Sequence, residues 1–362
     1  MIRDSRFRRR GLLKTAGAGG LVAAAPGVFL GPRLAGAAET VRTLMWEGYE
    51  MRVPPAEGYE VQPTFMVANE DPINKRGTYD VSVGILGIFD TLHTAGVMQP
   101  LDKARLPNWS LLDPEFVNDP LIVQGGDLVG MPYVWASLGF TYLDEGGAAP
   151  TKLEDLLDPR FKGRLGIGDD GNSVIIQVAR MLGLGGDQPG YLTSEEMDRV
   201  FEVLGQFKEN AFGVIANPYA EFAGAYTRGE IVAAFPDNAP TTLRVAEAGL
   251  DCKVAFDPAS AFSWIDALFI ASDVEASDTI YKFLDDGLRT ETQYAIGKEL
   301  GWAVANGEAM TRLAGEGPLW SIYADRAQVF ANAPNVAWPP LESDTYETYD
   351  VWLKRWQDFK AS

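Results

Sequence analysis

The 362-residue sequence contains a single cysteine, Cys252, and a single histidine, His93. One cysteine excludes an internal disulfide, and one histidine excludes a three-histidine metal site. Any Ser-His-Asp or Cys-His catalytic site would have to use His93, which lies near an expected helix end, where capping is the commoner role. The sequence also lacks a GxxxxGK[ST] phosphate-binding motif and the spaced ligands of an EF-hand loop. We therefore expect no catalytic triad, metal or cofactor.

Basic residues are scarce, with 31 Lys and Arg against 50 Asp and Glu and a formal net charge of −19. Seven of the basic residues and one acidic residue fall within residues 1–38, so the remainder carries 24 basic and 49 acidic residues. Nucleic acid and anionic membrane surfaces are poor partners for so acidic a chain. A cationic ligand would be attracted, although acidity also serves solubility, and both interpretations stay open.

The N-terminus has the pattern of an export signal. Arg8-Arg9-Arg10-Gly11-Leu12-Leu13-Lys14 is typical of a twin-arginine motif, and an Ala/Gly-rich run follows it. That run is too weakly apolar for a membrane span, which needs about 20 mostly apolar residues. Ala35-Gly36-Ala37 then provides a small-x-small cleavage pattern. We expect residues 1–38 to be a twin-arginine signal peptide that is cleaved near Ala37. We expect the mature protein to diffuse freely in the periplasm, because a lipid anchor needs a cysteine at the new N-terminus and the only cysteine, Cys252, is far from it.

The rest of the chain, about 324 residues, is long enough for two domains. Short apolar runs alternate with helical patterns, which predicts an α/β protein. A capping box of Thr193 and Glu196 predicts a helix over Met197–Lys208. Aromatic residues spaced three and four apart predict a C-terminal helix over Ser343–Lys360 with one buried face. The expected strands include Thr43–Trp46, Glu60–Met66, Tyr79–Val83, Gly130–Val134, Leu165–Gly168, Phe212–Ile215, Ile231–Phe235, Val254–Phe256 and Ala267–Ala271.

Several segments together resemble the periplasmic spermidine/putrescine-binding protein family. They are Tyr79-Asp80-Val81-Ser82-Val83, Gln99-Pro100-Leu101-Asp102-Lys103, Leu106-Pro107-Asn108-Trp109, Leu112-Asp113-Pro114-Glu115-Phe116, Met131-Pro132-Tyr133-Val134-Trp135, Leu156–Arg164 and Phe262-Ser263-Trp264-Ile265-Asp266-Ala267-Leu268. The likeness covers most of residues 43–360, and its specificity lies in the order and spacing of the segments. The resemblance implies a two-lobed periplasmic-binding-protein fold of type II-like form, with hinged lobes and a ligand cleft between them.

The resemblance also implies a role and a division of the chain. We expect residues 39–140 and 267–312 to form lobe 1, and residues 141–266 and 313–362 to form lobe 2. The family's role is to deliver a small amine to the permease of an ABC transporter in the inner membrane. We therefore expect a monomeric binding protein, with no enzymatic activity, whose partners are a small-molecule amine and that permease, and not nucleic acid.

Trp264 and Asp266 form the strongest candidate binding pair. On a strand their spacing points both side chains to one face, and an aspartate within the apolar run Phe262–Phe269 would be costly without a partner. A ring beside a carboxylate suits an ammonium group, since a cation over an aromatic face gains about 0.5–2 kcal/mol. The resemblance implies the same use for this pair, although a core tryptophan beside a surface aspartate is the ordinary alternative.

The resemblance implies five further binding residues. Trp46 and Tyr49 would provide ring walls, and Trp302 would provide another, with core packing as the alternative for each. Asp170 would be an acidic ligand contact, although helix capping explains it equally well, and Ser173 stands where relatives carry a second acid. Relatives' serine, tyrosine and tryptophan contacts map to other residue types at Ile85, Gly87 and the Pro236–Asn238 stretch, where Asp237 could compensate. A smaller diamine, an amino acid-like amine or another compact cation therefore also fits this reduced set of contacts.

Two other classes of function stay open at this point. A secreted hydrolase could use two of the many carboxylates, as glycoside hydrolases do when the two are suitably spaced. A binding module that serves a receptor instead of a transporter would have the same sequence features.

Overall fold

The computed structural model describes residues 38–362. The twin-arginine motif and the Ala35–Ala37 cleavage pattern lie outside these residues, so the export signal stays a prediction. Over the described part of the chain, no helix combines the length and the apolar character needed to cross a membrane.

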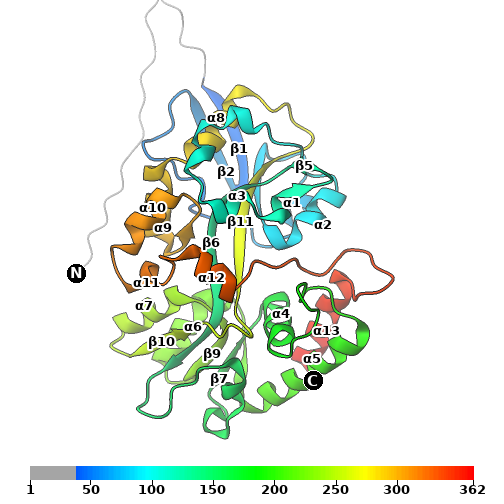
Figure 1. Cartoon of the computed structure of the whole chain (residues 1–362), viewed down its shortest axis with the longest axis vertical. Helices are drawn as coiled ribbons and strands as arrows, with labels where there is room; N and C mark the ends of the chain where they lie inside the picture. Colours follow the sequence, from blue (N-terminus) through cyan, green and yellow to red (C-terminus); the bar gives the residue numbers. More distant parts are fainter. Residues whose placement is uncertain (1–37) are drawn as a thin grey trace, which may run out of the picture. The chain divides into compact units, whose positions relative to one another are not determined.

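The first group of strands in the main sheet is built around β1 (Glu39–Met45), which pairs in parallel with β2 (Tyr59–Phe65) and β3 (Val81–Ile85). The long strand β11 (Phe262–Ile270) pairs antiparallel with β3 and with β6 (Met131–Leu143). All five residues of β3 are buried, as expected for a strand covered on both faces. This group occupies the upper part of Figure 1.

The second group of strands comprises β7 (Leu165–Gly168), β8 (Ala211–Ile215), β9 (Ala233–Asp237) and β10 (Cys252–Ala255). β7 pairs in parallel with β8 and β9, while β9 and β10 pair antiparallel with β6. The full order is β2-β1-β3-β11-β6-β9-β7-β8, with β10 and the short β12 (Ala303–Val304) also paired with β6. A separate two-stranded sheet joins β4 (Val123–Gln124) to β5 (Asp127–Leu128).

The two strand groups are connected through β6, which runs from one to the other in Figure 1. Its first part, from Met131 to Leu138, pairs with β11, and its last part, from Gly139 to Leu143, pairs with β9 and β10. β6 therefore belongs to both groups and joins them. This is the arrangement that a hinged, two-lobed protein requires.

Helices cover both strand groups. They are α1 (Asp71–Asn74), α2 (Phe89–Thr94), α3 (Pro114–Val117), α4 (Gly171–Met181), α5 (Ser194–Asn210), α6 (Pro218–Thr227), α7 (Ala239–Glu247), α8 (Asp278–Gly287), α9 (Thr290–Leu300), α10 (Gly307–Ala314), α11 (Pro318–Ser321), α12 (Arg326–Asn332) and α13 (Tyr349–Ala361). Short 3-10 helices occupy Leu86–Ile88, Lys103–Arg105, Pro107–Leu111, Pro120–Ile122, Leu153–Leu157 and Pro159–Phe161. The expected capping box is present, because the Thr193 hydroxyl accepts the backbone N–H of Glu196 at the start of α5.

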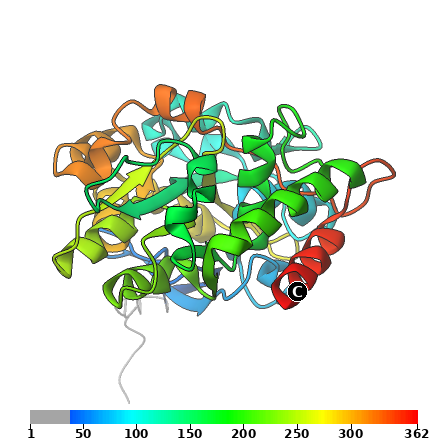
Figure 2. The ribbon, with the colours of Figure 1, turned by 90° about the horizontal axis from the view of Figure 1, so that it is seen from below.

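The C-terminal helix is shorter than the sequence predicts, because α13 begins at Tyr349 and not at Ser343. The Ser343 hydroxyl accepts the backbone N–H groups of Thr345 and Tyr346 and forms a turn there instead. Tyr346 is therefore exposed and is not part of the helical stripe. The remaining aromatic residues, Tyr349, Trp352, Trp356 and Phe359, are buried as expected. Figure 2 shows α13 in red beside the green helices of the second group.

The segment between α12 and α13, residues 333–348, runs along both strand groups. The backbone N–H of Trp338 donates to the Gly87 carbonyl, after β3, and that of Glu347 donates to the Leu192 carbonyl, before α5. The segment packs so closely on Gly87 and Gly190 that neither position has room for a side chain. A Cβ on Gly87 would lie 2.4 Å from Cδ1 of Trp338, and one on Gly190 would lie 2.1 Å from the Ala337 carbonyl oxygen. The segment thus contacts both groups before α13 begins.

Candidate functional site

Asp266 and Tyr49 form the centre of the candidate site. Asp266 lies on β11 opposite Ile85 of β3 and Val134 of β6. The Tyr49 hydroxyl donates to Oδ2 of Asp266 over 2.8 Å, and both side chains are buried. Burial raises the pKa of Asp266 to about 7, although the hydrogen bond from Tyr49 opposes part of that rise. Asp266 is therefore a carboxylate that water stabilises poorly. No basic side chain among residues 38–362 lies within 4.0 Å of it.

The second oxygen of Asp266 is available for a ligand. Among the described residues no group donates to Oδ1. The β-ladder also changes register immediately after Asp266, and such irregularities commonly redirect side chains next to binding sites. An ionised carboxylate offers about four acceptor positions, and Tyr49 uses one of them. Asp266 can therefore accept further hydrogen bonds from a cationic ligand.

Two tryptophans make an aromatic corner beside the two strands that pair with this part of β6. Trp264 lies opposite Ala136 of β6, and Trp302 directly precedes β12, which pairs with β6 on its other side. Their rings meet edge to face at an interplanar angle of 81°, with centroids 5.3 Å apart. Both are half-buried, so part of each ring is accessible. The register is regular from Trp264 to Asp266, which places these two side chains on one face, as predicted from their spacing.

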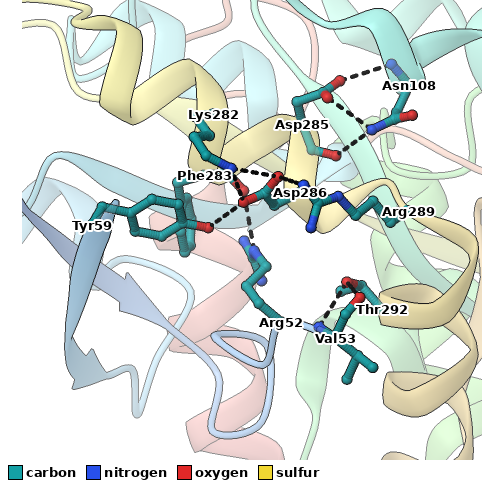
Figure 3. A network of polar contacts seen from close by, with 10 residues as sticks. All are labelled: Arg52, Val53, Tyr59, Asn108, Lys282, Phe283, Asp285, Asp286, Arg289 and Thr292. Carbon is teal, nitrogen blue, oxygen red and sulfur yellow. Dashed lines mark hydrogen bonds and ion pairs between the residues drawn. The ribbon is translucent and has the colours of Figure 1, made fainter. Parts of the chain in front are cut away.

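The turn that carries Tyr49 is held by residues that sequence reasoning missed. Nη1 of Arg52 and the hydroxyl of Tyr133 both donate to the Tyr49 backbone carbonyl, over 3.1 Å and 3.0 Å. Nε of Arg52 also donates to the Phe283 carbonyl of α8, and its guanidinium lies 3.8 Å from the centre of the Phe283 ring. Figure 3 shows Arg52 reaching from this turn toward α8. Trp46 is half-buried at the start of the same turn, where its carbonyl accepts the Tyr49 N–H.

Most of the remaining groups in Figure 3 surround two adjacent acids of α8, Asp285 and Asp286. Asp286 is buried, and it accepts from Lys282, Arg289 and the Tyr59 hydroxyl. Asp285 accepts from the backbone and side chain of Asn108. Because each acid already has donors, this network stabilises α8 against the strands and leaves little capacity for a ligand.

Asp170 lies at the N-terminus of α4, in the second group. Its Oδ1 accepts the backbone N–H of Ser173 over 3.3 Å, so it caps the helix. Its Oδ2 accepts the hydroxyl of Tyr219 over 2.9 Å. Burial and the charge of Asp170 raise the pKa of Tyr219 well above its usual value. Capping and a free acceptor capacity thus coexist at Asp170, while the buried Ser173 supports the cap.

Asp237 is a structural group of the second strand group. Its side chain is fully buried, and its oxygens accept from the hydroxyls of Thr141 and Thr241 and from the backbone N–H of Asn238. Burial raises its pKa to about 7. With three donors in place, Asp237 has little acceptor capacity left with which to compensate for the tryptophan that relatives carry in this stretch.

The seven predicted residues thus form local clusters. Tyr49 contacts Asp266, Trp264 contacts Trp302, Asp170 contacts Ser173, and Trp46 is tied to Tyr49 through the backbone. No hydrogen bond between described residues joins Asp170 directly to Asp266. The four hollows described for residues 38–362, of about 200 to 380 Å³, are lined by other residues.

The fold is the two-lobed fold of periplasmic binding proteins. A substrate-binding protein of a spermidine/putrescine ABC transporter, PotD from Streptococcus pneumoniae, superposes with a TM-score of 0.72 at 18% identity, covering 89% of this chain and 97% of that one. The Tp0655 lipoprotein of Treponema pallidum gives 0.70 at 12% identity, covering 90% and 100%. The two-lobed fold predicted from the sequence is confirmed.

Sequence comparison agrees with the resemblance. The spermidine/putrescine-binding periplasmic protein of Escherichia coli (strain K12) is 24% identical over 293 residues, 79% of each chain. The putrescine-binding periplasmic protein PotF of the same organism is 26% identical over 255 residues, 66% of this chain and 68% of its own. No family model matches the chain. The maltotriose-binding protein of Thermus thermophilus shares the fold at a TM-score of 0.60, so the ligand depends on the site and not on the fold.

Proposed function

We propose that the chain is a periplasmic solute-binding protein of an ABC importer, which binds a small cationic amine between its two lobes. The observation that carries the proposal is Asp266, a buried carboxylate with one oxygen bound by Tyr49, the other unoccupied by described groups, and no basic side chain in contact. A buried carboxylate is stable only when a positive charge or several donors compensate it. An ammonium group supplies both.

The neighbouring rings suit the rest of such a ligand. Trp264 and Trp302 present two faces at nearly a right angle, which can cover an alkyl chain and attract its charge. Tyr49 holds the carboxylate in one orientation. We assign Trp46 to the wall of the site, and Asp170 with Ser173 to its far side in the second lobe. Micromolar binding needs about −8 kcal/mol in total, so several of these contacts must act together.

The relatives' names support the cellular part of the proposal. They are periplasmic binding proteins, and we infer that this chain works there too, after export by the twin-arginine route and cleavage near Ala37. Residues 39–140 and 267–312 would form one lobe, and residues 141–266 and 313–362 the other. A monomer that closes on its ligand would present both lobes to the permease. It would not transform the ligand.

A thermal-shift screen tests this function. We expect small diamines to raise the melting temperature of the mature protein, since a ligand at 100 times its Kd adds about 2.7 kcal/mol to the free energy of unfolding. Neutral sugars and carboxylic acids of similar size are the controls and should give no shift. Amino acids carrying one ammonium group separate the amino acid-like alternative from the diamine.

Analysis of the ligand after incubation completes the screen. A bound amine should be recovered unchanged, as transport requires. Stabilisation by sugars alone, or conversion of the ligand to a product, would contradict the proposed function.

A further inference from the structure

Arg52 is a buried positive charge that touches no carboxylate. It is 7% exposed, and among residues 38–362 no Asp or Glu forms an ion pair with it. Its guanidinium donates to carbonyl oxygens instead, from Nε to Phe283 over 3.1 Å and from Nη1 to Tyr49 over 3.1 Å and Met51 over 2.6 Å. Nη2 is buried without a hydrogen-bond partner among the described residues. Because an unpaired buried charge is costly, an apolar side chain would suit a purely space-filling role better.

The guanidinium is held in place by the helices that follow β11. It stacks on the Phe283 ring of α8, 3.8 Å from the ring centre, and Nη2 lies against Gly287, where an added Cβ would be 3.1 Å away. The next residue is fixed as well, because the hydroxyl of Thr292 in α9 both accepts from the Val53 N–H and donates to the Val53 carbonyl, each over 3.0 Å. Figure 3 shows both attachments of this turn.

Through these attachments Tyr49 is held at its backbone and at its ring. The Tyr133 hydroxyl accepts from Nη1 of Arg52 over 2.9 Å and donates to the Tyr49 carbonyl over 3.0 Å. The rings of Tyr49 and Tyr133 pack edge to face, with centroids 5.8 Å apart. The Tyr49 hydroxyl then donates to Oδ2 of Asp266. A continuous set of contacts thus leads from α8 through Arg52 to one oxygen of the candidate carboxylate and leaves the other oxygen available.

We propose that Arg52 is a positioning residue for amine binding, which holds Tyr49 so that its hydroxyl fixes the Asp266 carboxylate, and which does not contact the ligand. The inference rests on the proposed function and adds to it a residue outside the ligand contacts. Only a planar guanidinium, with donors on separate nitrogens, reaches the Phe283 and Tyr49 carbonyls together. A lysine keeps the charge but has a single nitrogen, so Arg52→Lys removes the geometry and leaves the electrostatics nearly unchanged.

A double-mutant cycle tests whether Arg52 acts through Tyr49. Isothermal titration of the mature protein with butane-1,4-diamine at pH 8.5 compares the wild type, Arg52→Lys, Tyr49→Phe and the double variant. Each single variant should bind the diamine at least about 10-fold more weakly, as for the loss of a hydrogen bond to a charged group. The double variant should bind within about twofold of Tyr49→Phe, since residues that act through one contact are not additive.

The pH dependence of affinity distinguishes positioning from a general loss of stability. The hydrogen bond from Tyr49 lowers the pKa of Asp266 against the effect of burial, so its loss raises that pKa. The midpoint of the affinity profile should therefore move up by about 0.5–1 pH unit in both single variants. The other groups facing Tyr49 and Tyr133 are Arg52 and Glu50, and Arg52→Lys changes the charge of neither.

Tyr59→Phe is the matched control. It removes a buried hydroxyl that donates to Asp286 of the same helix, α8, so it should lower the melting temperature but leave the affinity and its midpoint unchanged. If Arg52→Lys does not fold, Tyr133→Phe replaces it in the cycle, because it removes one donor to the Tyr49 carbonyl. The same upward shift of the midpoint is expected, with a smaller loss of affinity.

The outcomes separate this inference from the function on which it rests. If the wild type binds the diamine and Arg52→Lys binds it equally well, Arg52 has no positioning role and the proposed function stands. Losses that multiply to about 100-fold in the double variant, or a lower affinity with an unmoved midpoint, would also contradict the inference. If the wild type binds no amine, both proposals fail.

Discussion

Replacing Asp266 with asparagine is expected to abolish amine-induced stabilisation while the protein stays folded. Removing one partner of a buried charge pair typically costs about 2–5 kcal/mol, which lowers affinity by at least about 30-fold. The fold should tolerate the change, because Tyr49 can still donate to the amide oxygen. The unliganded variant should even gain stability at pH 8, where wild-type Asp266, with its pKa of about 7, is forced to ionise.

The matched control is Asp169→Asn. Asp169 is a half-buried acid next to Asp170. It already accepts hydrogen bonds from Lys360 and from the indole N–H of Trp356. Its replacement should lower the melting temperature and leave the amine-induced shift in place. Trp264→Ala should behave like Asp266→Asn and lose the shift. Normal amine affinity in both Asp266→Asn and Trp264→Ala would show that these two residues do not bind the amine.

Amine affinity is expected to depend steeply on pH, because the cation binds the ionised form of Asp266. Its pKa of about 7 in the unliganded protein means that ionisation must accompany binding at lower pH. The association constant should fall about tenfold for each pH unit below pH 6 and level off above pH 8. Titration calorimetry in two buffers of different ionisation enthalpy should show nearly one proton released at pH 5.5 and almost none at pH 8.5.

The sign for stability is the opposite of that for binding. A carboxyl whose folded-state pKa is raised favours folding while it stays protonated, so its contribution is complete below pH 4 and is lost as the pH rises through 7. Asp266 and Asp237 both have pKa values of about 7. Asp237→Asn should therefore change the pH dependence of unliganded stability but not that of binding. A pH-independent amine affinity in the wild type would contradict the role given to Asp266.

Much of the fold could be predicted from the sequence because its elements have local signals. The strand Leu165–Gly168 is found where the sequence places it, and the Thr193 capping box starts α5 as expected. β11 covers Phe262–Ile270, so it includes Trp264 and Asp266, which were expected on a strand, and most of the expected strand Ala267–Ala271. The predicted C-terminal helix starts six residues too early, because the spacing of the aromatic residues does not reveal the turn at Ser343.

The site was less predictable, because its contacts join distant residues. The Trp264–Asp266 spacing identified two side chains of one face, but nothing in the sequence pairs Tyr49 with Asp266, 217 positions later. Arg52 had no motif to mark it, although an arginine three residues after a tyrosine can reach back to its carbonyl, as it does here.

A structure of the mature protein crystallised with butane-1,4-diamine tests the central claim most directly. It should show one ammonium nitrogen within about 2.7–3.2 Å of Asp266 Oδ1 and the alkyl chain against the rings of Trp264 and Trp302. A diamine bound elsewhere, with Asp266 still contacted by Tyr49 alone, would contradict the account.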